Sequence, residues 1–373
     1  MSCGEPSGDL YAAELVKQLR GHVPGLSAWG VGGDRLAAEG ASLVAHIADL
    51  AVVGLLEVLR HIPTIRRAFR RVVEAVDRER PDAAVLIDYP DFNLSLAREL
   101  KRRGIPVVYY VSPQIWAWKR GRIRTIRETV SRMLVIFAFE EALYRDAGVP
   151  VSYVGHPLVD LVRPAPDRSS FLLGHGLDPK RPVIALLPGS RPMEMAHNLP
   201  RLLGGVRQIA AERPDAQFLL AVAPLLDVAG TAALCAGLPV HVVPGQAHAA
   251  VGAADVAIVA SGTATVETAL LGTPMVVVYR VAPLTYALGR PFIRVPHFAM
   301  VNLIAEREVV PELMQGDFTP ERVAAETLSL LSDTNRSGRM REDLAEVRRR
   351  LGETGATARV AEIVAPFLTP PRP

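Results

Sequence analysis

The chain has 373 residues, of which 49% are hydrophobic and 22% charged, so it is long enough for two domains and too apolar for a disordered protein. Its two cysteines, Cys3 and Cys235, stand far apart without CxxC spacing or a histidine cluster, which argues against a disulfide scaffold or a zinc site and fits a reducing compartment. The net charge is only +3, and no uncharged run approaches the roughly 20 residues of a membrane-spanning helix.

Strand-like and helix-like segments alternate along the chain, which predicts parallel sheets with helical crossovers. The first half is expected to form helices over residues 10–20, 52–79 in two pieces, 94–103 and 123–130, and strands over 83–87, 106–111, 132–136 and 151–154. A proline-rich linker is expected over 164–167. Beyond it we expect strands over 183–187, 217–221, 240–243, 256–259 and 275–278, and helices over 199–212, 265–271 and most of 320–366.

This alternation predicts an α/β chain of two doubly wound Rossmann-like domains that face each other across a cleft. The expected boundaries are residues 1–163 for the first domain, 168–345 for the second, and 346–373 for a helical C-terminal segment. Ligands of such sheets bind at the carboxyl ends of the strands. The residues that carry the chemistry are therefore expected in the loops that follow strands.

The chain opens with a glycine turn, Gly4-Glu5-Pro6-Ser7-Gly8-Asp9, just before the first predicted helix. Ser7 or Asp9 is suited to cap that helix, whereas Glu5 has no such structural explanation. A turn of this kind usually follows a central strand, and only three residues precede it here. We expect the first sheet to have a weakened centre, either because the sequence starts late or because the strand has been lost.

Two regions are strongly basic: residues 60–80 hold seven arginines against three acidic residues, and residues 98–132 hold ten Lys or Arg against two. Such regions attract nucleic acid or anionic lipid, or they are solvated helix faces. Residues 47–73 also carry apolar side chains at helical spacing, edged by arginines. This pattern fits a helix lying in a membrane headgroup region and a helix facing the core, and the sequence leaves both open.

The strand over 83–87 runs into Asp88-Tyr89-Pro90-Asp91-Phe92-Asn93. A carboxylate at a strand end can take a proton from a sugar hydroxyl, and its surroundings can adjust its pKa for that task. Asp91 is the candidate base. Asp88 and Asn93 fit at least as well as turn and cap residues.

Two tryptophans, Trp116 and Trp118, stand beside polar groups in the next strand-end segment. Such a pair can stack on sugar faces or lie at a membrane interface, although packing in the core is the commoner role. Residues 30–33 form a glycine cluster that is too isolated to indicate a dinucleotide site.

In the second half, the predicted buried strand over 183–187 is followed by the turn Pro188-Gly189-Ser190-Arg191. Gly189 allows a ligand close to the backbone, the amides of the turn can donate to phosphate oxygens, and Arg191 offers a fixed positive fork. A strand followed by a glycine turn is also common in α/β proteins without such a ligand.

A similar strand end follows residue 260, where Ser261-Gly262-Thr263 precedes a helix that contains Glu267. Hydroxyls and a helix amino end favour phosphate, and a carboxylate one turn on can accept hydrogen bonds from ribose hydroxyls. Ser261 and Thr263 would also serve simply to cap the helix. The two sites together predict that the second domain binds a nucleotide diphosphate.

The chain resembles the lipid-A-disaccharide synthases, glycosyltransferases of Gram-negative bacteria, through seven blocks in order. These are residues 4–9 (GEPSGD), 88–93 (DYPDFN), 111–118 (VSPQIWAW), 155–157 (GHP), 187–191 (LPGSR), 261–267 (SGTATVE) and 311–315 (PELMQ). The chain departs from the family in the near absence of a first strand and in Pro6, where alanine is common.

The resemblance implies a two-Rossmann (GT-B) fold and an inverting transfer of 2,3-diacylglucosamine from UDP onto 2,3-diacylglucosamine 1-phosphate, giving a β-1,6-linked disaccharide and UDP. It implies no metal and no cofactor. Asp91 would be the base on the acceptor 6-hydroxyl, and Glu5 would belong to the same site. The expected substrate-binding residues are Ser7, Ser190, Arg191, Ser261, Gly262, Thr263, Glu267, Asn302 and Gln315.

The expected partners are these acylated substrates and a membrane surface, with no nucleic acid, and the family is often dimeric through its carboxyl-terminal part. The expected location is the cytoplasm, peripherally at the inner face of the inner membrane. Two other functions remain open at this point: a related UDP-N-acetylhexosamine transferase or epimerase acting on non-lipid substrates, and a nucleotide-sugar-binding protein without turnover.

Overall fold

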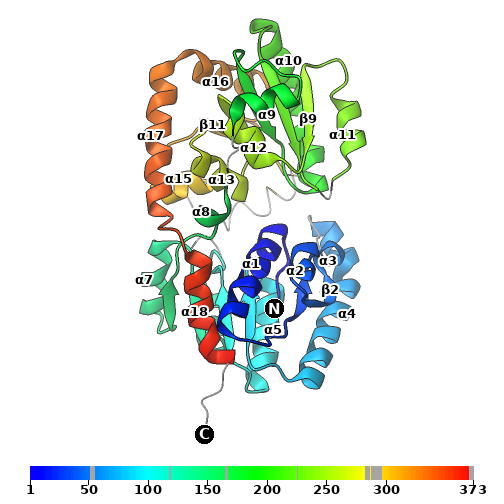
Figure 1. Cartoon of the computed structure of the whole chain (residues 1–373), viewed down its shortest axis with the longest axis vertical. Coiled ribbons are helices and arrows are strands. Elements are labelled where there is room, and N and C mark those ends of the chain that lie inside the picture. Colours follow the sequence, from blue (N-terminus) through cyan, green and yellow to red (C-terminus); the bar gives the residue numbers. More distant parts are fainter. Residues whose placement is uncertain are drawn as a thin grey trace. The chain divides into compact units, whose positions relative to one another are not determined.

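Two parallel β-sheets organise the chain, one in each of two units (Figure 1). The computed structural model describes residues 1–50, 55–116, 119–163, 167–224, 226–281, 286 and 296–368, without the side chains of 55–61. The first unit comprises Met1–Asp160 and the segment from Leu351 on, and the second unit comprises the described residues between Leu161 and Arg350. Residues 164–166 of the expected linker lie outside the described residues.

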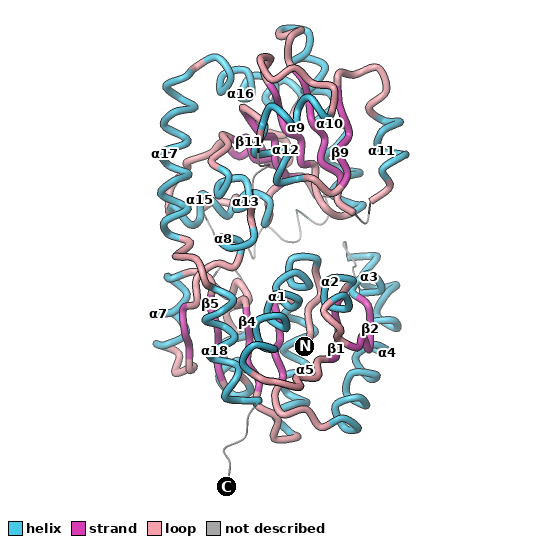
Figure 2. Tube along the Cα trace, viewed as in Figure 1, coloured by secondary structure: helices cyan, strands magenta, loops and turns pink. Residues whose placement is uncertain are grey.

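The first unit is built on the strands β1 (Trp29–Gly32), β2 (Ser42–His46), β3 (Ala84–Ile87), β4 (Val107–Tyr110), β5 (Arg132–Val135) and β6 (Val151–Tyr153). All the neighbouring pairs described here run parallel, in the orders β1-β2 and β3-β4-β5-β6 (Figure 2). The sequence predicted β3 to β6 to within one residue at each end but not β1 and β2.

Ser2 connects these two groups of strands at the centre of the sheet. It forms isolated parallel bridges to Val31 of β1 and to Leu86 of β3. Its amide donates to the carbonyl oxygen of Val85 at 3.0 Å, and the next amide, of Cys3, donates to that of Val31 at 3.1 Å. The short segment before Gly4 therefore occupies the central strand position of the first unit.

The helices of the first unit cover both faces of this sheet. They are α1 (Pro6–His22), α2 (Asp34–Ala38), α3 (Ile47–Leu50), α4 (Leu55–Glu79), α5 (Pro90–Arg102), α6 (Arg122–Thr129), α7 (Ala138–Asp146) and, from the end of the chain, α18 (Ala356–Leu368), which packs against α1. The two pieces expected over residues 52–79 are one helix from Leu55 on, with Pro63 inside it; residues 51–54 lie outside the described part.

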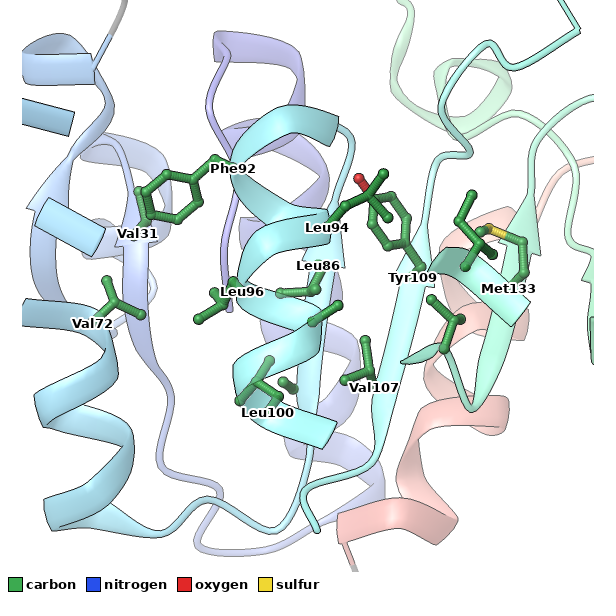
Figure 3. Close-up of a cluster of buried hydrophobic side chains, with 14 of the residues drawn as sticks. Val31, Val72, Leu86, Phe92, Leu94, Leu96, Leu100, Val107, Tyr109 and Met133 are labelled. Atoms are coloured by element: carbon green, nitrogen blue, oxygen red, sulfur yellow. The ribbon is translucent and has the colours of Figure 1, made fainter. Parts of the chain in front are cut away.

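Figure 3 shows the core beneath α4 and α5, where Phe92, Leu96 and Leu100 of α5 point toward strand residues such as Leu86. Val72 of α4 belongs to the same cluster. From residue 62 on, therefore, the apolar stripe of the amphipathic helix faces the core. The more amino-terminal part of that stripe, residues 52–59, has no described side chains.

The second unit holds, within its described residues, a six-stranded parallel sheet in the order β12-β11-β10-β7-β8-β9. Its strands are β7 (Val183–Leu187), β8 (Gln217–Val222), β9 (Val240–Pro244), β10 (Val256–Ala260), β11 (Met275–Tyr279) and β12 (Glu312–Met314). Residues of β7, β8 and β10 are all buried, as expected of parallel strands covered on both faces. Only β12 was not predicted.

The helices of the second unit are α9 (Arg168–Gly174), α10 (Pro192–Glu212), α11 (Val228–Leu234), α12 (Ala247–Ala253), α13 (Thr263–Leu271), α15 (Met300–Ala305), α16 (Pro320–Ser332) and α17 (Thr334–Arg350), while α8 (Leu158–Leu161) spans the boundary of the units. The parallel α/β architecture predicted from the sequence is confirmed in both units.

Candidate functional site

The turn between β3 and α5 has a strained backbone. Asp88 and Tyr89 are both in the left-handed region, with φ of 46° and 48°. Residues other than glycine seldom adopt this region, and where they do so the surrounding structure must hold them there.

Asn93 is the residue that holds this turn. It is fully buried, and its Nδ2 donates to the carbonyl oxygens of Asp88 (2.8 Å), Ile87 (3.2 Å) and Ser2 (3.2 Å). The hydroxyl of Tyr109 also donates to the carbonyl oxygen of Asp88, at 2.6 Å. Asn93 is therefore a buried residue that holds the turn, in agreement with the structural role considered for it from the sequence.

Asp91 lies in the first turn of α5, with a side chain that is 75% exposed. Its carboxylate pairs with Arg122 and, at 3.4 Å, with Nζ of Lys119. Partial burial raises the pKa of Asp91, but the hydrogen bonds and charges of Arg122 and Lys119 outweigh it, so the net pKa lies below the usual value. The carboxyl group is therefore ionised at neutral pH and can accept a proton.

Tyr89 lies near both carboxylates that were predicted to share a site. Burial raises the pKa of its phenol, and the charges of Glu5 and Asp91 raise it further, which requires both carboxylates to lie nearby. The tyrosine ring also covers Gly4, because a β-carbon placed on that glycine would lie 2.2 Å from Cγ of the ring. The structure thus brings Glu5 and Asp91 into one neighbourhood.

The amino-terminal turn differs from the expectation in one respect. Helix α1 begins at Pro6, so Ser7 and Asp9 lie inside it and neither caps it; the cap position is that of Glu5. Asp9 is buried and caps α2 instead, accepting from the amides of Gly33 (2.6 Å) and Leu36 (3.2 Å). Ser7 is half-buried in the first turn of α1.

In the second unit, Glu194 holds the loop after β7, and the motifs of the sequence did not mark this residue. Glu194 accepts from the amide of Ser190 at 2.9 Å and from Arg191 at 2.7 Å. Gly189 has a φ of 138°, and a β-carbon there would collide with Glu194. Glu194 stands three residues after Arg191, the cap of α10, which is the glutamate position of a capping box and could have indicated it.

The loop after β10 leads into α13, which begins at Thr263; the cap residue before it, Gly262, has a φ of 147°, which favours glycine. The hydroxyl of Ser261 donates to the carbonyl oxygen of Phe298 at 3.0 Å, whereas Thr263 is exposed. Glu267 lies within 3.6 Å of Nε2 of His248, on α12. The exposed amino end of α13 and the half-buried Glu267 remain suitable for phosphate and ribose.

The two remaining predicted residues make contacts within the protein. Asn302 is fully buried and holds the turn before β12, since its amide nitrogen donates to Glu312 (2.8 Å) and its oxygen accepts from the amides of Val309 and Val310. The amide of Gln315 can pair with both backbone groups of Val281, at 3.1 and 3.2 Å. Asn302 thus holds the segment before β12, and Gln315 can pair with the chain just after β11.

Further observations concern metal ions, membrane-spanning helices and the two tryptophans. Within the described residues, no group of three or more His, Cys, Asp or Glu side chains is arranged to hold a metal ion. In the same part of the chain, every helix is too short or too polar to cross a membrane. Trp118 lies outside the described residues, and Trp116 is considered below.

The fold is that of two-domain enzymes that handle UDP-sugars and of glycosyltransferases. A UDP-GlcNAc 2-epimerase structure from Neisseria meningitidis, bound to UDP-GlcNAc, matches with a TM-score of 0.63 at 11% identity, over 95% of this chain and 97% of that one. The calicheamicin glycosyltransferase CalG4 matches with a TM-score of 0.62 at 16% identity, over 100% and 97% of the two chains. These likenesses define a GT-B-like fold.

The sequence comparisons are more specific. The family model described as lipid-A-disaccharide synthetase matches residues 1–366. A lipid-A-disaccharide synthase from Myxococcus xanthus is 47% identical over 99% of this chain and 97% of its own length, and one from Geobacter sulfurreducens is 45% identical over 98% and 96%. The chain therefore belongs to the lipid-A-disaccharide synthase family, the glycosyltransferases of lipid A biosynthesis.

Proposed function

We propose that Asp91 is the general base of this transfer. Its carboxylate takes the proton of the acceptor 6-hydroxyl while that oxygen attacks the anomeric carbon of UDP-2,3-diacylglucosamine. The bond from this carbon to UDP breaks, and its electron pair leaves with UDP, so the configuration at the carbon inverts. The observation that carries the proposal is an exposed carboxylate in the first turn of α5, shortly after β3, that is ionised at neutral pH and paired with Arg122 and Lys119.

The donor is assigned to the second unit. Arg191, the amides of the Gly189–Arg191 turn and the amino end of α13 would stabilise the charge that develops on UDP, and Glu267 would accept hydrogen bonds from the ribose. Support comes from the position of both loops at the carboxyl ends of the adjacent strands β7 and β10. Asn302 and Gln315 would act by shaping the loops around that site.

The acylated substrates also require access to a lipid surface. We propose peripheral attachment at the inner face of the inner membrane through the exposed arginine edge of the amphipathic region over 47–73. Arg66, Arg67 and Arg70 of α4 are exposed and could contact anionic headgroups. Self-association through the C-terminal part is a further expectation, which sedimentation of the purified chain would test.

The deciding experiment incubates the purified protein with both acylated glucosamine substrates in detergent and detects the disaccharide and UDP. Asp91→Asn should lower turnover at least about a hundredfold, as is usual for loss of a general base, while UDP affinity stays nearly unchanged. An equal loss of UDP binding, or full turnover in the variant, would contradict the role of Asp91.

The same assay separates the other functions considered from the sequence. A donor without acyl chains should not replace the acylated donor if the family reaction is correct. Epimerised UDP-sugar as the main product would favour an epimerase. Membership of the synthase family at 45–47% identity favours the lipid substrates, whereas the epimerases share only the fold.

A further inference from the structure

A buried carboxylate lies beneath the connection that brings Lys119 and Arg122 to Asp91. Glu140, in the first turn of α7, is 1% exposed. Its Oε1 accepts from Nε1 of Trp116 at 3.2 Å, and its Oε2 accepts from the amide of Phe137 at 3.4 Å.

The surroundings of Glu140 offer donors to a carboxylate. Burial raises its pKa to about 7, and the hydrogen bonds from Trp116, Ser112 and Phe137 oppose that rise without cancelling it. A glutamine or an apolar residue could fill this space without burying a charge, and burying an ionised group is costly. Capping of α7 through the Phe137 amide explains only one of its oxygens.

Two titratable groups near Glu140, Tyr144 and His156, have pKa values far from neutrality. Tyr144 lies on the same helix and hydrogen-bonds to the Ser112 hydroxyl at 2.8 Å, and burial raises its pKa far above neutrality. His156 packs against the Phe137 ring with centroids 5.5 Å apart, and burial lowers its pKa to about 3. A change near pH 7 in this cluster would therefore report on Glu140 itself.

Trp116 lies in the connection between β4 and α6. This connection begins with a strained residue, and the residues at its far end pair with Asp91. Val111, a β-branched residue, has a φ of 64° at its start. Trp116 follows and is held by Glu140. Lys119 and Arg122, three and six positions after Trp116, pair with Asp91.

We infer that Glu140 is a positioning residue for the glycosyl transfer, because it holds Trp116 and thereby fixes the chain three positions before Lys119, which pairs with Asp91 as Arg122 does. The inference rests on the proposed role of Asp91. Glu140 itself touches neither substrate. It acts through the indole of Trp116, and in its ionised form it holds that indole most firmly.

The test compares Glu140→Gln, Trp116→Phe and the double variant, with Glu141→Gln as the matched control. Glu141 is the next carboxylate on the same helix, and it pairs with Arg145 instead. Glutamine keeps an acceptor for the indole but removes the titration, and phenylalanine keeps an aromatic ring but removes the donor. All variants are assayed for disaccharide formation between pH 5.5 and 9, and their folding is checked by thermal unfolding.

At pH 8 each single variant should lower kcat by about tenfold, the usual effect of losing one hydrogen bond to a charged group. The double variant should be no slower than the singles, because each single variant already removes the hydrogen bond between the indole and a charged carboxylate. The kcat of the wild-type chain should fall on the acid side with a midpoint near pH 7, together with a change in tryptophan emission. Both signals should be absent from Glu140→Gln and Trp116→Phe and kept in Glu141→Gln.

Two results would overturn the inference: additive losses in the double variant, or a Glu140→Gln enzyme that loses only thermal stability and keeps the wild-type pH profile. Should Glu140→Gln fail to fold, Trp116→Phe tests the same contact from the other side, by its kcat and its emission. A failure of the proposed function looks different. In that case Asp91→Asn would keep its turnover. The pH dependence near pH 7 would not be affected by that failure, because the pKa of Asp91 is lowered and this limb does not belong to it.

Discussion

The hydroxyl of Ser2 donates to Oδ1 of Asn93 at 2.6 Å, joining residues that stand 91 positions apart in the chain. The same asparagine binds the carbonyl oxygens of Ile87 and Asp88 through its nitrogen. One buried amide therefore ties the central strand position of the first unit to the turn that carries Asp91. The geometry of the candidate base depends on this amide.

Replacing Asn93 with Ala should cost about 2–4 kcal/mol of unfolding free energy, because the Ser2 hydroxyl and a strained turn lose buried hydrogen bonds. Urea denaturation measures this cost. Lys101→Ala, at an exposed position of the same helix, should change stability by less than about 0.5 kcal/mol. Equal stabilities of the two variants would show that Asn93 does not hold the turn.

Gly4→Ala should displace the Tyr89 ring and lower disaccharide formation, because the new β-carbon would lie 2.2 Å from Cγ of the ring. The substitution should also destabilise the protein by about 1–3 kcal/mol through overpacking. Gly21→Ala is the control: no atom lies within 4 Å of its β-carbon position, so alanine should stabilise α1 by about 0.5–1 kcal/mol. Normal activity of Gly4→Ala would contradict the packing of Tyr89 described above.

Arg122→Gln should move to higher pH the acid limb of kcat/KM that belongs to Asp91, which lies at lower pH than the limb assigned to Glu140. Arg122 lowers the pKa of Asp91 through its hydrogen bond and its charge, so its removal raises that pKa and protonates the base at a higher pH. Arg124→Gln, two residues along and exposed, should leave the limb in place. A shift in the opposite direction would refute the assignment of this limb to Asp91.

Arg191→Gln should weaken UDP binding by about tenfold to a hundredfold, the range expected when a charged donor to phosphate is lost. Isothermal titration with UDP measures the effect, and Arg207→Gln, exposed further along α10, is the control. UDP affinity that is equal in both variants would remove Arg191 from the diphosphate site.

His156 should make the protein less stable in acid. Burial lowers its pKa from 6.5 to about 3, so below pH 6.5 the unfolded chain binds a proton that the folded chain does not. Unfolding free energy is then lost progressively as pH falls from 6.5 towards 3. His156→Asn keeps an acceptor for the Leu158 amide, which His156 binds at 3.2 Å, and should show a shallower loss between pH 7 and 4.5 in urea titrations.

The buried strands were predictable because their residues are apolar on both faces, as in β7 and β10, and this signal does not depend on the rest of the fold. The strands β1, β2 and β12 carry a weaker signal. Trp29–Gly32 contains two glycines, Ser42 is exposed, and β12 has only three residues. Pairing with neighbouring strands, which the sequence does not reveal, makes them strands.

The site residues were predictable where a motif marks them, and not where burial decides the role. Glu140 stands three residues after the cap residue Phe137, a position that indicates a helix cap, but nothing in the sequence indicates its contact with Trp116, which joins α7 to the connection after β4. Asp9 stands in a helix start, yet it caps α2, 24 or more positions away. Such assignments require the tertiary structure.

The last helix of the chain completes the first unit. Asp160 accepts from the amides of Gly355 and Ala356 at 2.8 and 3.0 Å, and Arg359 donates to the carbonyl oxygen of Val154. During synthesis, residues 1–160 leave the ribosome long before α18 exists, so the amino-terminal unit must be the last to mature. A premature stop codon just before residue 351 would remove α18 from the first unit, although that unit is translated first. The second unit, which is translated later, would keep all of its segments up to Arg350.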